Sequence, residues 1–266
     1  MAHSPVEIER RGDVAVVRFA RPEVHHAMNR ELLEGLADTT KKLRSDDDVR
    51  AVVVTGGDRA FCAGGDLQFI VDYAPGPAAA VRHLAGVLHE AIVDIRRMPK
   101  PVIAAIRGSA AGAGMSLALA CDLRVVGRSA RFVLAYGSRG LSVDGGAGFS
   151  LPRLVGLARA LEIAALDEPI DAERALALGL ATRVVDDARV FEEALALADR
   201  LAARAVRAFG EAKRLFLESF ETSLEVELDR ERDVLAEVVT RPEAAEGIAA
   251  FREKRPPVFR RRKGGD

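Results

Sequence analysis

The stretch Phe61-Cys62-Ala63-Gly64-Gly65-Asp66-Leu67 follows the apolar run Ala51-Val52-Val53-Val54-Thr55, which reads as a buried strand. A second turn of small residues, Gly112-Ala113-Gly114, comes after another such run at residues 101–106. Small residues let main-chain N–H groups approach a ligand closely. Two such turns side by side would direct two N–H donors at one oxygen, which is the construction of an oxyanion hole. The alternative interpretation is close helix–strand packing through small residues.

The composition indicates a globular protein without a charged partner. The chain has 266 residues, which fits one large domain or a core with a smaller appendage. A net charge of -1 provides no attraction to nucleic acid or to a membrane, and we expect neither as a partner. Cys62 and Cys121 form neither a disulfide framework nor a metal-binding spacing, so we expect a reduced, cytoplasmic protein without a bound metal.

The order of apolar segments predicts an α/β fold. A hairpin is expected at residues 6–19, and Asn29 is a candidate cap for the helix that follows it. The strands at 51–55, 101–106 and 123–126 alternate with helices, which is typical of a largely parallel sheet. After about residue 158 the pattern becomes helical, with one extended segment at 182–185. Helices are expected at residues 161–166, 172–178, 189–208, 211–220, 224–239 and 242–254.

The loop of residues 136–148 is rich in glycine, and Asp144 is its single carboxylate. An acid among glycines and apolar residues can lie close to a substrate. The same residue type is also a preferred N-cap, and a helix is expected to begin near Gly146. The residues alone therefore leave two roles open for Asp144, a helix cap and a catalytic group.

These segments together resemble the crotonase superfamily, the enoyl-CoA hydratase/isomerase family, from about Val6 to Phe259. The resemblance is closest to the ring-epoxide isomerases of phenylacetate breakdown and to related enoyl-CoA isomerases. The family resemblance is carried by Arg21-Pro22 with Ala27-Met28-Asn29, by residues 61–67, by Lys100-Pro101 through Gly108, by Ala110 to Gly114, by Cys121-Asp122 and by residues 151–156 and 175–180. The closer match is carried by Ala111 to Gly114, Ser129 to Val133 and Glu227 to Asp233.

The resemblance implies that the chain acts on acyl-CoA thioesters, with coenzyme A as part of the substrate and no separate cofactor. The amides of Gly65 and Ala113 would hold the thioester oxygen, and Asp144 would be the catalytic acid. The family usually has glycine where this chain has Ala113. The residues expected to contact substrate are Ala27, Ala63, Gly64, Asp66, Leu67, Tyr136, Phe251 and Lys254, the last two from the C-terminal region of a neighbouring subunit.

Departures from the family pattern favour isomerisation. The two glutamates of the hydratases fall at Ser116 and Tyr136, neither of which is a carboxylate base. Asp144 falls at the place of the isomerases' aspartate, and one carboxylate suffices to move one proton. In the aryl-CoA dehalogenases of this family the aspartate is instead a nucleophile, with a histidine base near His89. Those enzymes have a tryptophan at the place of Tyr136, whereas this chain has no Trp.

Other side chains have simpler interpretations. His89 fits a solvated helix face, His26 fits a surface histidine as well as a substrate contact, and Cys62 fits buried packing. Tyr136 fits either packing or a hydrogen bond near Asp144.

The expected fold is an α/β crotonase-like spiral of ββα units. Residues 1–200 would form the acyl-CoA-binding core, and residues 201–266 a helical region for assembly into a homotrimer or homohexamer. The expected function is an acyl-CoA isomerase. The alternatives are a hydratase-like or dehalogenase-like reaction on the same scaffold, or a non-catalytic acyl-CoA-binding or assembly protein.

Overall fold

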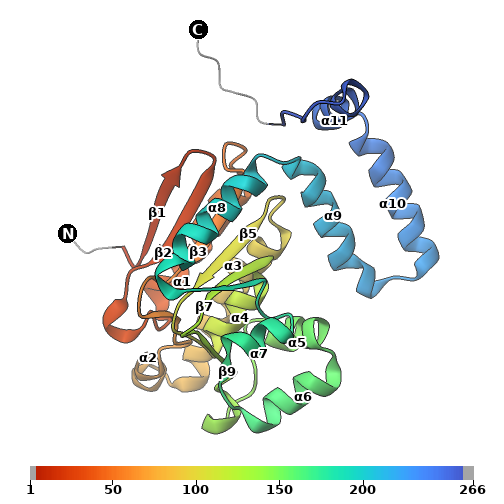
Figure 1. Ribbon diagram of the computed structural model, residues 1–266. Coiled ribbons are helices and arrows are strands. Elements are labelled where there is room, and N and C mark those ends of the chain that lie inside the picture. The colour runs from red at the N-terminus through yellow and green to blue at the C-terminus, as the bar shows by residue number, and fades with distance from the viewer. Residues whose placement is uncertain (1–3, 260–266) are drawn as a thin grey trace.

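The computed structural model describes residues 4–259 and contains two sheets (Figure 1). In the larger sheet β1 and β2 form an antiparallel hairpin, as expected, and the remaining neighbours are parallel. Its order is β1 (Val6–Arg11), β2 (Val14–Phe19), β3 (Ala51–Thr55), β5 (Val102–Ile106), β7 (Leu123–Gly127) and β10 (Arg183–Val185). The smaller sheet has the order β4 (Ala60–Cys62), β6 (Ser109–Ala111), β8 (Arg131–Val133) and β9 (Ile170–Asp171).

The chain passes through these sheets in a repeated order. Strands β3, β5 and β7 of the larger sheet are each followed by a short strand of the smaller sheet, and then by a helix. This arrangement is the expected spiral of ββα units. The helices of this part are α1 (Arg30–Ser45), α2 (Leu67–Asp72), α3 (Pro77–Arg97), α4 (Ala113–Ala120), α5 (Ala147–Val155), α6 (Leu157–Leu166), α7 (Ala172–Ala177) and α8 (Val190–Ala202). The predicted cap of α1 is present, since the N–H of Leu32 donates to the Asn29 side chain.

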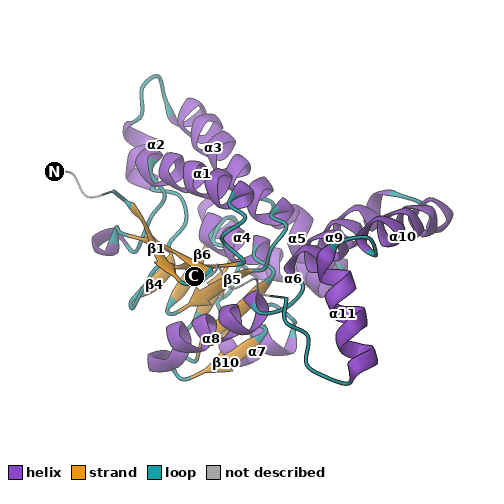
Figure 2. Ribbon diagram, turned by 90° about the horizontal axis from the view of Figure 1, so that it is seen from above, coloured by secondary structure: helices purple, strands orange, loops and turns teal. Residues whose placement is uncertain are grey.

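The central strands β2, β3, β5 and β7 of the larger sheet are buried on both faces, which explains why they are almost continuously apolar. Val53 and Ile103 pack with Ala194 and Leu197 of α8 on one face. Val52 and Ala104 pack on the opposite face in the main core. Helix α8 therefore covers one side of the sheet, and α1, α3 and α4 lie on the other side (Figures 1 and 2).

The predicted helix at 189–208 is wrong at its end, because α8 stops at Ala202 and α9 (Val206–Glu218) begins as a separate helix. The reason is a tertiary contact that local sequence does not reveal. Arg50, at the start of β3, donates to the carbonyls of Ala202 and Arg204 at 2.7 and 2.8 Å. The guanidinium thereby satisfies acceptors that the break in the helix exposes.

Helices α9, α10 (Leu224–Val238) and α11 (Pro242–Glu253) form an arm that extends away from the sheets (Figures 1 and 2). One buried ion pair anchors it, since Nζ of Lys213 on α9 lies 2.9 Å from the Asp122 carboxylate and also donates to the Ile95 carbonyl. Residues 260–266, the end of the predicted C-terminal region, lie outside the described part of the chain.

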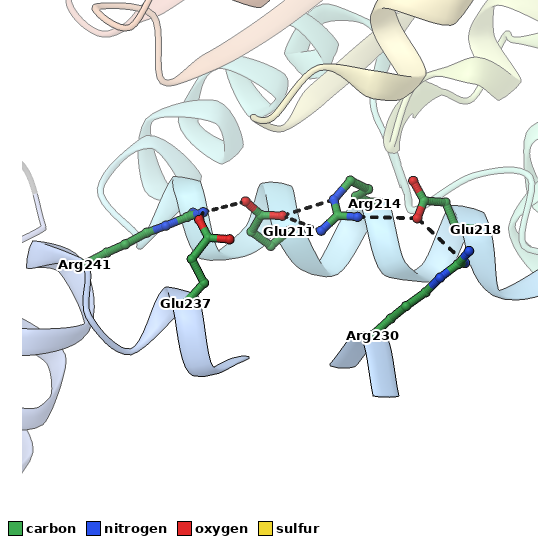
Figure 3. Close-up of polar contacts among 6 residues, drawn as sticks. All are labelled: Glu211, Arg214, Glu218, Arg230, Glu237 and Arg241. Carbon is green, nitrogen blue, oxygen red and sulfur yellow. Dashed lines mark hydrogen bonds and ion pairs between the residues drawn. The ribbon is translucent and has the colours of Figure 1, made fainter. Parts of the chain in front are cut away.

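A chain of ion pairs connects the helices of the arm (Figure 3). Arg241 lies 2.8 Å from Glu211 of α9, and Arg214 bridges Glu211 and Glu218. Single exposed pairs contribute little, but a connected network fixes the direction of α10 along α9. The residues of this network are Glu211, Arg214, Glu218, Arg230, Glu237 and Arg241.

Candidate active site

The first small-residue turn connects β4 to α2. Met28 pairs with this turn from the side, because its N–H donates to the Gly64 carbonyl at 2.7 Å and its carbonyl accepts from Asp66 N–H at 3.0 Å. Alternation along the chain then directs the amide of Gly65, the residue between them, away from Met28. Gly65 is one of the residues that line a cavity.

The second turn lies directly against the first. A Cβ atom placed on Gly64 would lie only 2.8 Å from the Ala111 carbonyl oxygen and 3.3 Å from the Ala113 nitrogen. Ala113 is the first residue of α4, and N–H groups in the first turn of a helix have no acceptor within it. Gly65 and Ala113 therefore line the same cavity.

The third loop brings Asp144 to this cavity, and its carboxylate is not a helix cap. The cap of α5 is Gly146, in a left-handed conformation and without a side-chain hydrogen bond. The Oδ1 atom of Asp144 instead lies 2.7 Å from Nε2 of His89 on α3. The Asp144 side chain is 33% exposed and that of His89 53%, so the pair remains accessible to solvent.

The cavity has a volume of about 470 Å³ and is mainly apolar. Among the described residues that line it, Asp144 is the only acid and Arg139 the only basic residue. Helix α3 lines the cavity with one face, formed by Val81, Leu84, Ala85 and Leu88. These residues are three and four positions apart, which is the spacing of one helix face and is visible in the sequence. The complete lining is Met28, Leu33, Ala63, Gly64, Gly65, Leu67, Ile70, Val81, Leu84, Ala85, Leu88, Gly112, Ala113, Ala135, Tyr136, Arg139, Leu141, Ser142, Val143 and Asp144.

The two places where hydratases carry glutamates lie beside Asp144. Ser116 is fully buried, and its hydroxyl donates to the Asp144 carbonyl at 2.7 Å. Tyr136 lines the cavity, but its hydroxyl is buried near Ser116 and Asp144 without reaching hydrogen-bonding geometry with a described residue. Burial raises the pKa of Tyr136 to about 12, so the phenol stays protonated at neutral pH.

The residues predicted to contact substrate fall into three groups. Four of them line the cavity, namely Ala63, Gly64, Leu67 and Tyr136. Ala27 and Asp66 are not among the lining residues; Arg21 donates to the Ala27 carbonyl and pairs with the Asp66 carboxylate at 3.1 Å. Asp66 also caps α2 by accepting from the N–H of Phe69. Phe251 and Lys254 lie on the arm, away from the lining residues, and Phe251 is 85% exposed.

His26 is not the surface histidine that was expected. It is only 3% exposed, and its Nδ1 accepts from the N–H of Arg21 at 3.2 Å. Burial lowers the pKa of His26, which favours the neutral ring needed for that acceptor role. Cys62 is buried, and its thiol donates to the His26 carbonyl. Both residues thus support the first turn from behind.

Within residues 4–259, no group of three or more His, Cys, Asp or Glu side chains is arranged to hold a metal ion. None of the helices described there combines the length and the apolar character required to cross a bilayer.

Comparisons with known proteins agree on one family. Residues 9–262 match the family described as Enoyl-CoA hydratase/isomerase. The chain is 36% identical to 1,2-epoxyphenylacetyl-CoA isomerase of Escherichia coli K12, over 92% of this chain and 94% of the relative. It is 34% identical to 4-chlorobenzoyl coenzyme A dehalogenase-2 of an Arthrobacter species, over 94% and 91%. The crystal structure of an enoyl-CoA hydratase from Polaromonas sp. JS666 superposes with a TM-score of 0.90 at 37% identity, covering 96% of this chain and 99% of the other.

Proposed function

Because the chain belongs to the enoyl-CoA hydratase/isomerase family, we propose that it is an acyl-CoA isomerase with Asp144 as its proton shuttle. The observation that carries this proposal is that Asp144 is the single acid among the described residues lining a cavity that Gly65 and Ala113 also line. A hydration that uses two carboxylates would need a second acid, and the described lining residues do not include one.

The proposed reaction begins with the thioester oxygen bound to the amides of Gly65 and Ala113. The Asp144 carboxylate removes a proton from the carbon next to the thioester, and the electron pair moves into the carbonyl to give an enolate. The two amides stabilise the negative charge on oxygen, and loss of one such donor typically lowers the rate a hundred- to a thousandfold. Asp144 then delivers a proton to a carbon further along the acyl chain, so the double bond moves and the composition of the acyl-CoA is unchanged.

The decisive variant is Asp144→Asn, which keeps the size of the side chain but removes the base. We expect its kcat on an isomerisable unsaturated acyl-CoA to fall about 10²–10⁴-fold, with little change in KM. The readout is the change in absorbance on conjugation of the double bond, together with exchange of solvent deuterium at the α-carbon. Full turnover by Asp144→Asn would falsify the role assigned to this carboxylate.

One observation favours a second candidate, a substitution at an aryl carbon. The 2.7 Å contact between His89 and Asp144 is the pairing that the resemblance to dehalogenases implies. There the carboxylate would attack the ring carbon that bears the halide, halide would leave, and water deprotonated by His89 would hydrolyse the resulting ester to a phenol. Rapid quenching with a 4-halobenzoyl-CoA decides between the two. An ester on Asp144 and released halide support substitution, whereas unchanged aryl-CoA with active isomerisation excludes it.

The arm gives reason to propose a homo-oligomer, a trimer or a hexamer, built by packing the arm on a second copy. Large apolar side chains that would otherwise face water gather there, including Phe216 at 70%, Leu224 at 70% and Phe251 at 85% exposure. Sedimentation equilibrium tests this directly. A monomer at micromolar concentration would refute the assembly and the proposed contact of Phe251 and Lys254 with a neighbour's coenzyme A.

A further inference from the structure

Ser116 connects the two halves of the site. It lies on α4 and is fully buried, and its Oγ is 2.7 Å from the carbonyl of Asp144 and 3.3 Å from the carbonyl of Gly112. Gly112 immediately precedes the amide of Ala113. One hydroxyl therefore lies between the turn that provides an oxyanion donor and the turn that carries the acid.

The acid's turn also packs directly on Ser116. Gly145 has φ of +60°, and a Cβ atom on it would lie 2.9 Å from Cβ of Ser116 and 3.2 Å from Cδ2 of Leu88. The main chain at residue 145 thus lies directly against the Ser116 side chain. A glutamate at this position, which the resemblance assigns to hydratases, would place a longer side chain beside this turn, and we expect the Asp144 turn to move to admit it.

The main chain of Asp144 is held from two directions. Its carbonyl accepts from Ser116 Oγ and also from the N–H of Ala147 at 3.2 Å. Its side chain is held separately, by His89. With the backbone fixed by Ser116 and the carboxylate oriented by His89, the free oxygen of Asp144 has a defined position in the cavity.

We propose that Ser116 is a positioning residue for Asp144 and that its small size commits this site to chemistry with one carboxylate. The proposal rests on the function proposed above. The proposal also explains why a serine is buried at the position of a hydratase glutamate. Its hydroxyl positions Asp144 and does not act on the substrate itself. Misplacement of a catalytic group by about 1 Å can lower a rate by as much as 10²-fold.

The test is a double-mutant cycle of Ser116→Ala and Asp144→Asn. We expect Ser116→Ala to lower kcat about ten- to a hundredfold while KM changes less than about twofold. In the Asp144→Asn background the same substitution should have almost no further effect, because its action passes through the missing carboxylate. The matched control is Ser150→Ala, which removes another serine hydroxyl from a buried position, on α5, and should leave kcat unchanged.

Two further variants keep the test decisive if Ser116→Ala folds poorly. Ser116→Cys preserves size with a weaker donor and should give an intermediate kcat. Ser116→Glu should lose at least as much activity as Ser116→Ala, because it displaces the turn. Additive losses in the cycle, or a Ser116→Glu enzyme as fast as the parent, would overturn the proposal. Undiminished activity of Asp144→Asn alone would instead refute the proposed function, so the two failures are distinguishable.

Discussion

Nε2 of His89 lies 2.7 Å from Oδ1 of Asp144, although one residue is on α3 and the other on the turn before α5. A carboxylate has two oxygens, so this contact leaves Oδ2 available for proton transfer. The histidine therefore selects which oxygen of Asp144 faces the substrate. The same geometry would place a histidine base beside a carboxylate nucleophile, and substitution of His89 separates these two roles.

His89→Gln should retain most isomerase activity, because the glutamine amide can still donate to the carboxylate. His89→Ala removes the hydrogen bond and should lower kcat about tenfold, the size of one bond to a charged group. Steady-state kinetics on an unsaturated acyl-CoA measures both values. If His89→Gln is as slow as His89→Ala, the histidine works as a base and not as an orienting donor.

The Lys213–Asp122 pair should be essential for anchoring the arm. Lys213→Met leaves the Asp122 carboxylate buried without its cation, which typically costs about 3–5 kcal/mol of unfolding free energy. Urea unfolding at pH 7 measures the loss. Burial raises the pKa of Asp122, and protonation removes the uncompensated charge, so the deficit should shrink as the pH is lowered.

The double variant Asp122→Asn/Lys213→Met is the control for this interpretation. It keeps an acceptor for the N–H of Val102 but carries no buried charge. We expect it to be more stable than Lys213→Met alone. If both variants unfold at the same urea concentration, the lysine contributes packing rather than charge compensation.

The buried thiols should make the protein sensitive to alkali. Burial raises the pKa of Cys62 and of Cys121 to about 12, against an ordinary value of 9.0. Between these values the unfolded chain releases protons that the folded chain retains, so stability falls as the pH rises. Each thiol contributes a slope of up to about 1.4 kcal/mol per pH unit.

Guanidinium unfolding between pH 8.5 and 11, compared with Cys62→Ala/Cys121→Ala, isolates the thiols. Lys100 acts in the opposite direction, because burial lowers its pKa to about 8, but its contribution cancels in the comparison. The parent should lose stability more steeply with pH than the variant. Parallel curves would show that the thiols ionise in the folded state as readily as in the unfolded chain.

Tyr136→Phe should not destabilise the fold. The hydroxyl of Tyr136 is buried without a hydrogen-bond partner among residues 4–259, and such a group typically costs about 1–3 kcal/mol. Its removal should leave the melting temperature equal or higher, as calorimetry can measure. A clear drop in melting temperature would mean that the hydroxyl is satisfied in solution, for example by water.

Local sequence predicts the strands of the larger sheet, the Asn29 cap and the turns at Gly64 and Gly112, because each depends on a pattern of neighbouring residues. It does not predict the short strands of the smaller sheet, which have two or three residues each. The end of α8 could not be predicted in this way, since Arg50 satisfies its carbonyls from a distant strand. Sequence alone also could not decide whether Asp144 caps a helix or acts as a catalytic group. Only the approach of α3 to this loop reveals that the carboxylate contacts His89.

Ser116 illustrates a second limit of sequence reasoning. The resemblance shows only that Ser116 stands where hydratases carry a glutamate. Its contact with the Asp144 carbonyl depends on how α4 packs against the third loop. The cavity wall on α3 shows the same limit. The spacing of Val81, Leu84, Ala85 and Leu88 indicates one apolar helix face, but only the fold shows that this face lines a cavity.

The close approach of the turns at Gly64 and Gly112 has a consequence for how this scaffold can change its reaction. The two turns are held together by main-chain contact, so substitutions elsewhere should leave the proposed binding of the thioester oxygen intact. The acid, in contrast, is carried by a loop whose neighbours at positions 89, 116 and 136 are ordinary side chains. New reactions can therefore arise by exchanging those few side chains while the carbonyl-binding half is inherited unaltered.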